Sequence, residues 1–469
     1  MIFSSLIFPV FFALVIGAML LSQNSGYRKT ILLVASYVFY GWWDIRFLAL
    51  IWLTTSLDYF LGGRIFRTTD SRLRKRYLGF SLCLNLGILG IFKYFNFFIE
   101  SANRLLTPLG WGVSTLEIIL PVGISFFTFQ SMSYSIDIYR DKLKPADSFR
   151  DFALFIAFFP QLVAGPIVRA KEFLPQLRNP VRFTPANFSN GIVIFLSGLI
   201  KKALIADRLA IYVDSVYGAS DTYHAATLWL ALIAYSLQIF CDFSGYSEMA
   251  IGLALCLGFR LPKNFNIPYS ATSIRDFWHR WHISLSAWLR DYLYISLGGN
   301  RKGRGRTYVN LMTTMVLGGL WHGASWNFVL WGFLHGGALA INRYWENAKL
   351  GWPSGWIGQF LGWIITMTIV GFGWLLFRIP TLSEGLTIAN RMLFDHGPGI
   401  EWIYAPLLIL LPMVFVAHAV GRYRETHSLS PYPPLDLTTF KGQLIVAVLL
   451  LGVLLYSPIG SSPFIYFQF

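Results

Sequence analysis

Long apolar runs recur along the whole chain, and no other feature constrains its fold as strongly. A helix of about 20 apolar residues is long enough to cross the hydrocarbon core of a bilayer, which is about 30 Å thick. Runs of this kind lie at Ser4 to Leu21, Leu78 to Phe98, Leu228 to Leu257, Trp356 to Phe377 and Gln443 to Tyr456. They predict an all-α polytopic integral membrane protein.

The composition favours one integral membrane domain over several soluble domains. Only 13% of the 469 residues are charged, against about a quarter in soluble domains. Because no long polar stretch interrupts the apolar runs, we predict a single domain, residues 1–469, of about ten or more helices. The first run lacks a basic segment and a small-residue cleavage site, which favours a retained helix over a removed signal peptide.

The distribution of positive charge predicts how the chain is oriented in the bilayer. The formal net charge is +15, and basic clusters mark cytoplasmic loops of membrane proteins. Segments poor in Lys and Arg (100–117, 214–227 and 380–400) are expected on the other side, which also places both termini outside. We interpret the charge as orienting the chain rather than as binding nucleic acid. The basic clusters are 62–76, 167–182, 301–306 and 421–441.

Two segments conflict with a simple count of crossings. Residues 151–167 have basic loops on both sides and contain Pro160, Gly165 and Pro166. A broken, re-entrant segment fits them better, because non-helical backbone at membrane depth persists only where protein or water covers it. Lys201 and Lys202 interrupt another apolar run, and we interpret them as a helix end or as side chains that snorkel to the interface.

Histidine and tryptophan gather in two segments, residues 276–306 and 318–337. Residues 273–297 alternate charged residues with Trp and Leu, which predicts one amphipathic basic helix at the interface or at the floor of a water-filled cavity. Asp276, His279 and His282 recur at every third position, which raises a metal site as an alternative. Further ligands are lacking and Arg residues nearby oppose a cation, so we expect no metal there.

His322 is a candidate general base. Histidine at membrane depth is costly and suggests a function, and burial lowers a histidine pKa and so favours the neutral ring. A neutral imidazole can accept a proton from a hydroxyl group. A structural role for His322 is the alternative. His335 lies thirteen residues further on, which places it on a different helix face, and we expect a structural role for it.

Four long motifs stand out in the chain: WHRWHISLSAWLRDYLYISLGGNR, LGGLWHGASWNFVLWG, FPQLVAGPIVR and CDFSGYSEMAIGLAL. They resemble segments of bacterial membrane-bound O-acyltransferases, in particular of their alginate O-acetyltransferase branch. The similarity extends over nearly the whole chain, including MIFSS at the start and ASYVFYGWWD at 35–44. The resemblance implies a ring of tilted helices with re-entrant segments around a central tunnel, in the bacterial inner membrane. It also implies that His322 is catalytic and that His282 is a second functional histidine, but it assigns no role to His279.

The resemblance also implies a donor and a partner. Relatives move an acetyl or D-alanyl group across the membrane, so that a periplasmic acetyltransferase or esterase-like partner can esterify a polysaccharide such as alginate or cellulose. We expect acetyl-CoA, or an acyl carrier, to donate the acetyl group from the cytoplasm. Arg280, Arg290 and Trp321 are the candidate donor-binding residues, with Lys302 as a further basic residue; serving only as topology charges is the alternative for the basic ones.

The chain ends in an aromatic segment, SSPFIYFQF, whose Tyr466 carries a phenol. This ending resembles that of the small membrane peptide of D-alanylation systems, which implies that Tyr466 relays the acyl group. A phenol, with a pKa of about 10, ionises more readily than a serine hydroxyl. Nine residues separate Ser457 from Tyr466, so the extended tail 457–469 brings Tyr466 about 30 Å from Ser457, enough to enter the tunnel from the outer side. An interfacial aromatic anchor is the alternative.

Three other functions are alternatives to acetyl transfer onto an exopolysaccharide. The same mechanism could transfer D-alanine or acetylate peptidoglycan. A transporter would suit the broken segments, but it predicts paired repeats that the sequence does not show. A scaffold for polysaccharide export would tolerate replacement of His322.

Overall fold

The computed structural model describes the chain except residues 164, 395–396, 430–431, 433–434, 459–463 and 466–469. The described residues form helices and one isolated bridge, between Tyr223 and Ile400, but no named strand. They divide into unit 1 (Met1–Phe195 and Met249–Pro262) and unit 2 (Leu196–Glu248 and Lys263–Phe469). The all-α prediction is confirmed, and the single domain of residues 1–469 stays a prediction.

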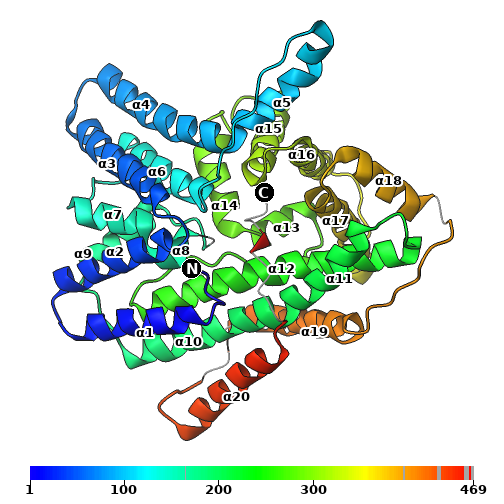
Figure 1. The fold of residues 1–469 in the computed structure, drawn as a ribbon. Coiled ribbons are helices and arrows are strands. Elements are labelled where there is room, and N and C mark those ends of the chain that lie inside the picture. Colours follow the sequence, from blue (N-terminus) through cyan, green and yellow to red (C-terminus); the bar gives the residue numbers. More distant parts are fainter. Residues whose placement is uncertain (164, 395–396, 430–431, 433–434, 459–463, 466–469) are drawn as a thin grey trace. The chain divides into compact units, whose positions relative to one another are not determined.

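Unit 1 is formed mainly by the helices that precede residue 196 (Figure 1). Helices α3, α4 and α6 pack against one another, and α7 packs against α2 and α3. The elements are α1 (Ile7–Leu20), α2 (Ser25–Gly41), α3 (Arg46–Arg67), α4 (Ser71–Leu89), η1 (Gly90–Tyr94), α5 (Phe95–Leu106), η2 (Thr107–Leu109), α6 (Ile124–Tyr139), α7 (Phe149–Ala157), α8 (Phe159–Leu162), α9 (Ala170–Arg178) and most of α10 (Pro185–Ile200).

Unit 2 carries both histidine-rich segments. Its closest helix pair is α15 with α16, and α16 also packs against α17 and α13. The elements are η3 (Lys201–Ala206), α11 (Asp207–Gly218), most of α12 (Ala225–Cys256), η4 (Pro268–Ser270), α13 (Ile274–Arg280), α14 (Ile283–Trp288), η5 (Leu289–Tyr294), α15 (Arg304–His322), α16 (Trp326–Asn347), α17 (Gly355–Arg378), α18 (Leu382–Leu393), α19 (Leu407–Thr426) and α20 (Phe440–Tyr456).

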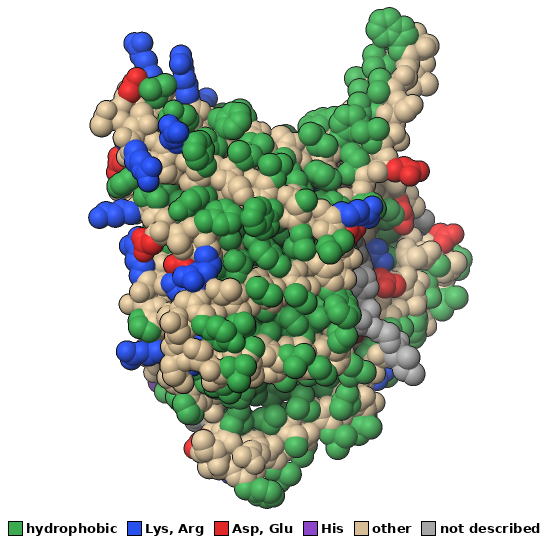
Figure 2. All heavy atoms as spheres, turned by 60° about the vertical axis from the view of Figure 1, so that its left-hand side comes forward, with side chains coloured by type: hydrophobic (Ala, Val, Ile, Leu, Met, Phe, Trp, Pro, Cys, Tyr) green, Lys and Arg blue, Asp and Glu red, His purple; other side chains and the backbone are tan. Residues whose placement is uncertain are grey.

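The apolar helices and their exposed side chains suit a lipid environment. Apart from a few residues at the ends of two of them, the five apolar runs predicted from the sequence lie in helical segments. Hydrophobic side chains cover broad areas of the face drawn in Figure 2, and large apolar side chains of α4, α19 and α20 are exposed. Five described segments are long and apolar enough to span a bilayer: Ser71–Leu109, Pro185–Gly218, Ala225–Cys256, Gly355–Arg378 and Leu407–Thr426.

The segment 151–167 is broken, as its Pro and Gly residues predict. Helix α7 has only nine residues and ends at Ala157, and the short helix α8 ends at Leu162. The described side chains from 151 to 167 are buried. Neither helix is long enough to cross a bilayer alone. Because the side chains around the break are buried, protein covers the non-helical backbone there.

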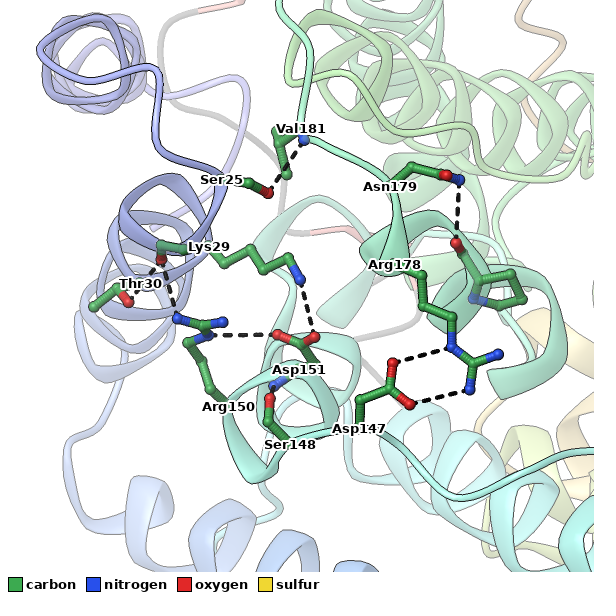
Figure 3. A network of polar contacts seen from close by, with 12 residues as sticks. Ser25, Lys29, Thr30, Asp147, Ser148, Arg150, Asp151, Arg178, Asn179 and Val181 are labelled. Carbon is green, nitrogen blue, oxygen red and sulfur yellow. Dashed lines mark hydrogen bonds and ion pairs between the residues drawn. The ribbon is translucent and has the colours of Figure 1, made fainter.

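One buried and one exposed ion pair join segments of unit 1. Lys29 Nζ lies 2.9 Å from Asp151 Oδ2, which joins α2 to α7. Figure 3 also shows Arg178 reaching both carboxylate oxygens of Asp147, at 3.1 and 3.3 Å. The pairing of Lys29 with Asp151 offsets part of the cost of removing both charges from water. Arg178 and Asp147 are 44% and 60% exposed, so their pair adds little to stability.

Lys202 neither snorkels nor lies at the water interface. Helix α10 does end at Ile200, but the chain continues as the π-helical turn η3. The side chain of Lys202 is buried, with Nζ 2.8 Å from Asp207 and 2.6 Å from Asp242. Lys201 pairs with Glu248 at 2.5 Å and is partly exposed. The interpretation of Lys202 as a snorkelling side chain is therefore wrong, because two carboxylates neutralise it inside unit 2.

Candidate active site

His282 lies at a sharp break between two short helices, so the predicted single helix over 273–297 is wrong. Helix α13 ends at Arg280 and α14 begins at Ile283. His282 has φ 44° and ψ 53°, a left-handed conformation that is uncommon outside glycine. The backbone hydrogen bonds leave the helix here, because Ile283 N–H donates to Asn264 O and Asn266 N–H donates to Arg280 O, both at 2.9 Å.

Asn264 holds the His282 ring in one tautomer. The Asn264 side-chain oxygen accepts hydrogen bonds from Ser284 N–H at 3.2 Å and Ser284 Oγ–H at 2.8 Å, and its amide nitrogen donates to Ser247 Oγ at 3.1 Å. The same oxygen lies 3.2 Å from His282 Nδ1. Because a carbonyl oxygen only accepts, Nδ1 carries the proton and Nε2 keeps the lone pair. Burial lowers the pKa of His282 to about 3, so the ring is neutral at physiological pH.

His322 is the last residue of α15 and is buried among aromatic rings. The ring centroid of His322 lies 5.1 Å from that of Trp331 and 5.3 Å from that of Phe377. Its centroid is 6.4 Å from that of His282. A hydroxyl oxygen about 2.8 Å from one nitrogen of each ring would span a separation of this size. The structure therefore brings the two predicted histidines close together.

Glycine allows α15 and α16 to approach closely enough to form this site. A Cβ atom on Gly319 would lie 2.1 Å from Phe328 O, and one on Gly332 would lie 2.6 Å from Met315 O. No side chain larger than hydrogen fits at such distances. The close packing sets Trp331 of α16 against His322 of α15, and so fixes the wall of the site.

A pocket of about 350 Å³ opens beside His322. His322 and Trp331 line one part of it, and Ile283 and Leu285 contribute apolar wall. Its charged lining consists of Arg275, Arg290 and Arg343, with His279 also present. An apolar pocket with a few charged groups suits a ligand that has an extended body and an anionic part.

The predicted donor-binding residues lie in three different settings. Arg290 lines the pocket, with its side chain 60% exposed and Nε 2.7 Å from Asp291. Arg280 is not a lining residue; it pairs with Asp276 at 2.8 Å and with Glu425 at 3.1 Å. Trp321 is buried, with its ring centroid 5.9 Å from that of His282 and 5.1 Å from that of His322. Tyr466 lies outside the described residues.

His335 lies on α16, a different helix from the one that ends at His322, rather than on another face of the same helix. Its buried ring lies 4.5 Å from Trp331 and 5.2 Å from Trp278, centroid to centroid. A Cβ atom on Gly373 would lie 2.6 Å from its Nε2. His335 therefore supports Trp331 from behind, in keeping with the structural role expected for it.

Sequence reasoning missed Asn264, Arg275 and Arg343. Asn264 lies eighteen residues before His282 in the chain, in a stretch with no motif of its own, so only the fold reveals the contact. Arg275 and Arg343 belong to separate helices, α13 and α16, and meet at the pocket. Among the residues that the structure describes, no three His, Cys, Asp or Glu side chains are grouped so as to hold a metal ion.

The chain is similar in sequence to known membrane proteins that transfer acyl groups. Residues 146–371 match the sequence model of the membrane-bound O-acyltransferase family. A probable alginate O-acetylase of Pseudomonas putida is 39% identical, covering all of both chains. One from Pseudomonas aeruginosa is 44% identical over 85% of this chain and 75% of its own length. A peptidoglycan O-acetyltransferase of Helicobacter pylori is 37% identical over 80% of this chain and 76% of its own length.

Proposed function

The chain belongs to the membrane-bound O-acyltransferase family and is an O-acyltransferase, and from this premise we propose that it transfers acetyl groups toward an exopolysaccharide. The relatives with the highest identities reported above are named as alginate O-acetylases, which favours alginate or a similar polymer, cellulose included, as the final acceptor. The observation that carries the proposal is the position of His322, which lines the pocket and faces His282 across 6.4 Å.

The pocket is the proposed binding site of the acetyl donor, a thioester such as acetyl-CoA or an acylated carrier protein. The apolar wall formed by Ile283 and Leu285 suits the chain that carries the thioester. Arg275, Arg290 and Arg343 supply positive charge for its phosphate groups. A donor bound in this way brings its reactive carbonyl to the end of the pocket where His322 lies.

In the first step, the hydroxyl oxygen of Tyr466 attacks the carbonyl carbon of the thioester. His322 accepts the phenolic proton as general base, and a new carbon–oxygen bond forms. The carbon–sulfur bond then breaks, and the thiol leaves with the proton that His322 returns. The products are acetyl-Tyr466 and a free thiol. An aryl ester remains reactive enough to pass its acetyl group on, because phenol is a better leaving group than an aliphatic alcohol.

His282 orients the reacting hydroxyl in this scheme. With Nδ1–H held by Asn264, Nε2 presents a lone pair that can accept a hydrogen bond. A ring whose pKa is lowered to about 3 stays neutral throughout and is a weak base, so His322 is the residue assigned to move the proton. Trp321, whose ring lies near both histidines, keeps water from hydrolysing the donor.

In the second step, a hydroxyl group of a periplasmic partner attacks the carbonyl carbon of acetyl-Tyr466. The bond from that carbon to the tyrosine oxygen breaks, and the phenol regains a proton. The partner, an acetyltransferase or esterase-like protein, then esterifies the polysaccharide. Ile465, the residue just before Tyr466, is buried in unit 2, which supports a tail that reaches the interior.

Replacing Tyr466 by Phe tests the relay directly. The change removes one oxygen and keeps the aromatic ring that an interfacial anchor would need. We expect acetyl transfer to stop, and mass spectrometry of the wild-type C-terminal peptide to show an acetyl group on Tyr466 that is absent from His322→Ala. Full activity of Tyr466→Phe would exclude the relay, and His322 would then activate a hydroxyl group of the partner.

The orientation of the protein completes the proposal. With the basic segments 62–76 and 301–306 in the cytoplasm of a bacterial inner membrane, the donor enters from inside and both termini are periplasmic. Cysteines placed at positions 70 and 303 should resist a membrane-impermeant thiol reagent in intact spheroplasts. Rapid labelling of either position would reverse the orientation.

Peptidoglycan is the second candidate acceptor. The 37% identity with a peptidoglycan O-acetyltransferase, over most of both chains, favours it. The chemistry at His322 would be unchanged, because the partner selects the sugar. Analysis of acetyl esters in purified exopolysaccharide and in purified peptidoglycan, from wild-type and His322→Ala cells, separates the two. D-alanyl transfer predicts instead that D-alanyl esters are lost.

A further inference from the structure

A buried ion cluster in unit 2 has no part in the transfer chemistry described above. Lys202 Nζ lies 2.6 Å from Asp242 Oδ1 and 2.8 Å from Asp207 Oδ1. All three side chains are at most 6% exposed. Two carboxylates and one ammonium group are expensive to bury, and ionisable residues inside membrane helices usually mark a function. The cluster therefore requires a reason beyond packing.

The cluster binds the C-terminal end of the chain. The backbone N–H of Ile465 donates to Asp242 Oδ2 at 2.7 Å, in a buried contact between residues 223 positions apart. The Phe464 ring lies 4.8 Å from Tyr246 and 5.7 Å from Phe243, centroid to centroid. Phe464 and Ile465 are 1% and 4% exposed. This end of the tail is seated inside unit 2, with its backbone at a carboxylate and its side chain among aromatic rings.

A second contact fixes the point where the tail leaves α20. Arg208 Nε donates to the backbone oxygen of Tyr456 at 2.9 Å, and Tyr456 is the last residue of α20. Arg208 follows directly after Asp207 of the cluster. Residues 202–208 thus hold the chain at Tyr456 and, through Asp242, at Ile465.

The two carboxylate oxygens of Asp242 bind different partners. Oδ1 faces Lys202, and Oδ2 accepts the tail N–H. A hydrogen bond to a carboxylate is stronger than one between neutral groups. The close approach of α12 to the chain before η3 makes the pairing possible, since a Cβ atom on Gly245 would lie 2.6 Å from Gly198 O. The packing of α12 and the ion pair with Lys202 therefore position the Asp242 carboxylate without help from the tail.

The docked tail lies next to the histidine pair. Phe243, which contacts Phe464, also packs edge-on against the ring of His282, with centroids 4.6 Å apart. A single aromatic ring thus separates the tail from His282. Tyr466 is the next residue after Ile465 in the chain.

We propose that Asp242, held by Lys202, is the docking site for the protein's own C-terminal tail: it binds the backbone N–H of Ile465 and so fixes the register of the chain just before Tyr466. Asp242 is a positioning residue, because it acts through the tail. That this docking presents Tyr466 to the acetyl donor rests on the proposed function, whereas the binding of the tail by Asp242 does not.

The docking is tested with a disulfide in a variant whose native cysteines, Cys83, Cys241 and Cys256, are replaced by serine. Cysteines introduced at Phe464 and Tyr246 should cross-link under mild oxidation, measured by loss of maleimide labelling. Ile465→Pro removes the N–H, and Ile465→Val keeps it. Loss of a hydrogen bond to a charged group should lower the cross-linking rate about tenfold in the proline variant, with the valine variant unchanged. Equal rates in both would overturn the docking site.

Asp242→Asn provides a second route that leaves the tail intact. We expect slower cross-linking, an unchanged KM for the acetyl donor and a kcat that falls with the cross-linking rate, because the donor pocket is untouched. A merely structural defect would instead lower the melting temperature and leave kcat per folded molecule unchanged, which would overturn the positioning role. If Tyr466→Phe is fully active while cross-linking still depends on Asp242, the relay fails and the docking site stands.

Discussion

Unit 1 and unit 2 both bury polar side chains, and in unit 2 the buried His322 lines the pocket described above. In unit 1, Asp58 of α3 accepts hydrogen bonds from Ser81 at 2.6 Å and Asn85 at 2.8 Å, both on α4. Those partners join helices to one another. In unit 2, Asn264 acts on His282, whose ring faces His322 at the edge of the pocket. The difference teaches that a buried polar group indicates chemistry only when its contacts lead to a space that a substrate can enter.

The largest effect should come from His322→Ala. Removing a general base typically lowers the rate about 10² to 10⁴-fold. We expect this loss in acetyl transfer from a radiolabelled donor by purified protein, with a melting temperature close to that of the wild type. His427→Ala, which alters an exposed ring, is the control and should keep full activity. Normal turnover in His322→Ala would show that this buried histidine of unit 2 takes no part in the reaction.

Asn264→Ala should lower kcat by up to about 10²-fold, the cost of misplacing a reacting group. Asn264→Asp keeps the acceptor for His282 Nδ1–H and adds a negative charge. A carboxylate favours the imidazolium form, so the pKa of His282 rises from its lowered value of about 3. The acid limb of the pH–rate profile should therefore move to higher pH. An unchanged profile with full activity in both variants would show that Asn264 does not control His282.

Asp58→Ala should affect stability and spare turnover. The change removes the carboxylate that Ser81 and Asn85 share and leaves them only their second acceptors, Ser135 Oγ and Ser81 O. Loss of a hydrogen bond to a charged group costs about 1.5–3 kcal/mol. We expect a lower melting temperature in detergent and an unchanged kcat per folded molecule. A fall in kcat at normal stability would assign unit 1 a role in catalysis that its closed polar network does not suggest.

Arg290→Ala should have the smallest effect. Its side chain is 60% exposed, so solvent and salt screen its attraction for an anionic donor. We expect the KM for acetyl-CoA to rise a few-fold at low salt, with kcat unchanged, and the difference to shrink as salt is added. Arg67→Ala, an exposed residue of unit 1, removes the same charge and should leave KM as it was.

The sequence predicted the elements well because apolar length is a local property. The run from Leu228 to Leu257 became α12, and the Pro and Gly residues after Phe158 correctly predicted a broken segment. The predicted continuous helix at 273–297 was wrong, since its backbone hydrogen bonds go to residues 264 and 266 instead. No local sequence pattern indicates that the backbone near His282 bonds to residues 264 and 266 and not within one helix.

The candidate site was predicted in part for the same reason. His282 and His322 lie in conspicuous motifs, and the structure brings them together. Asn264 and Asp242 lie in ordinary surroundings, and their roles depend on contacts with distant residues. Lys202 was misinterpreted because its two acidic partners, five and forty residues away, could not be recognised as neighbours from spacing alone.

The left-handed backbone of His282 implies a trade-off between durability and activity. A residue with a side chain costs about 1–2 kcal/mol more than glycine in this conformation. Glycine at position 282 would relieve that strain, but it would lose the imidazole and the buried contacts of the ring with Phe243 and Asn264. Strained residues of this kind persist where the reaction needs them. Stabilising changes in this protein are best sought away from the turn between α13 and α14.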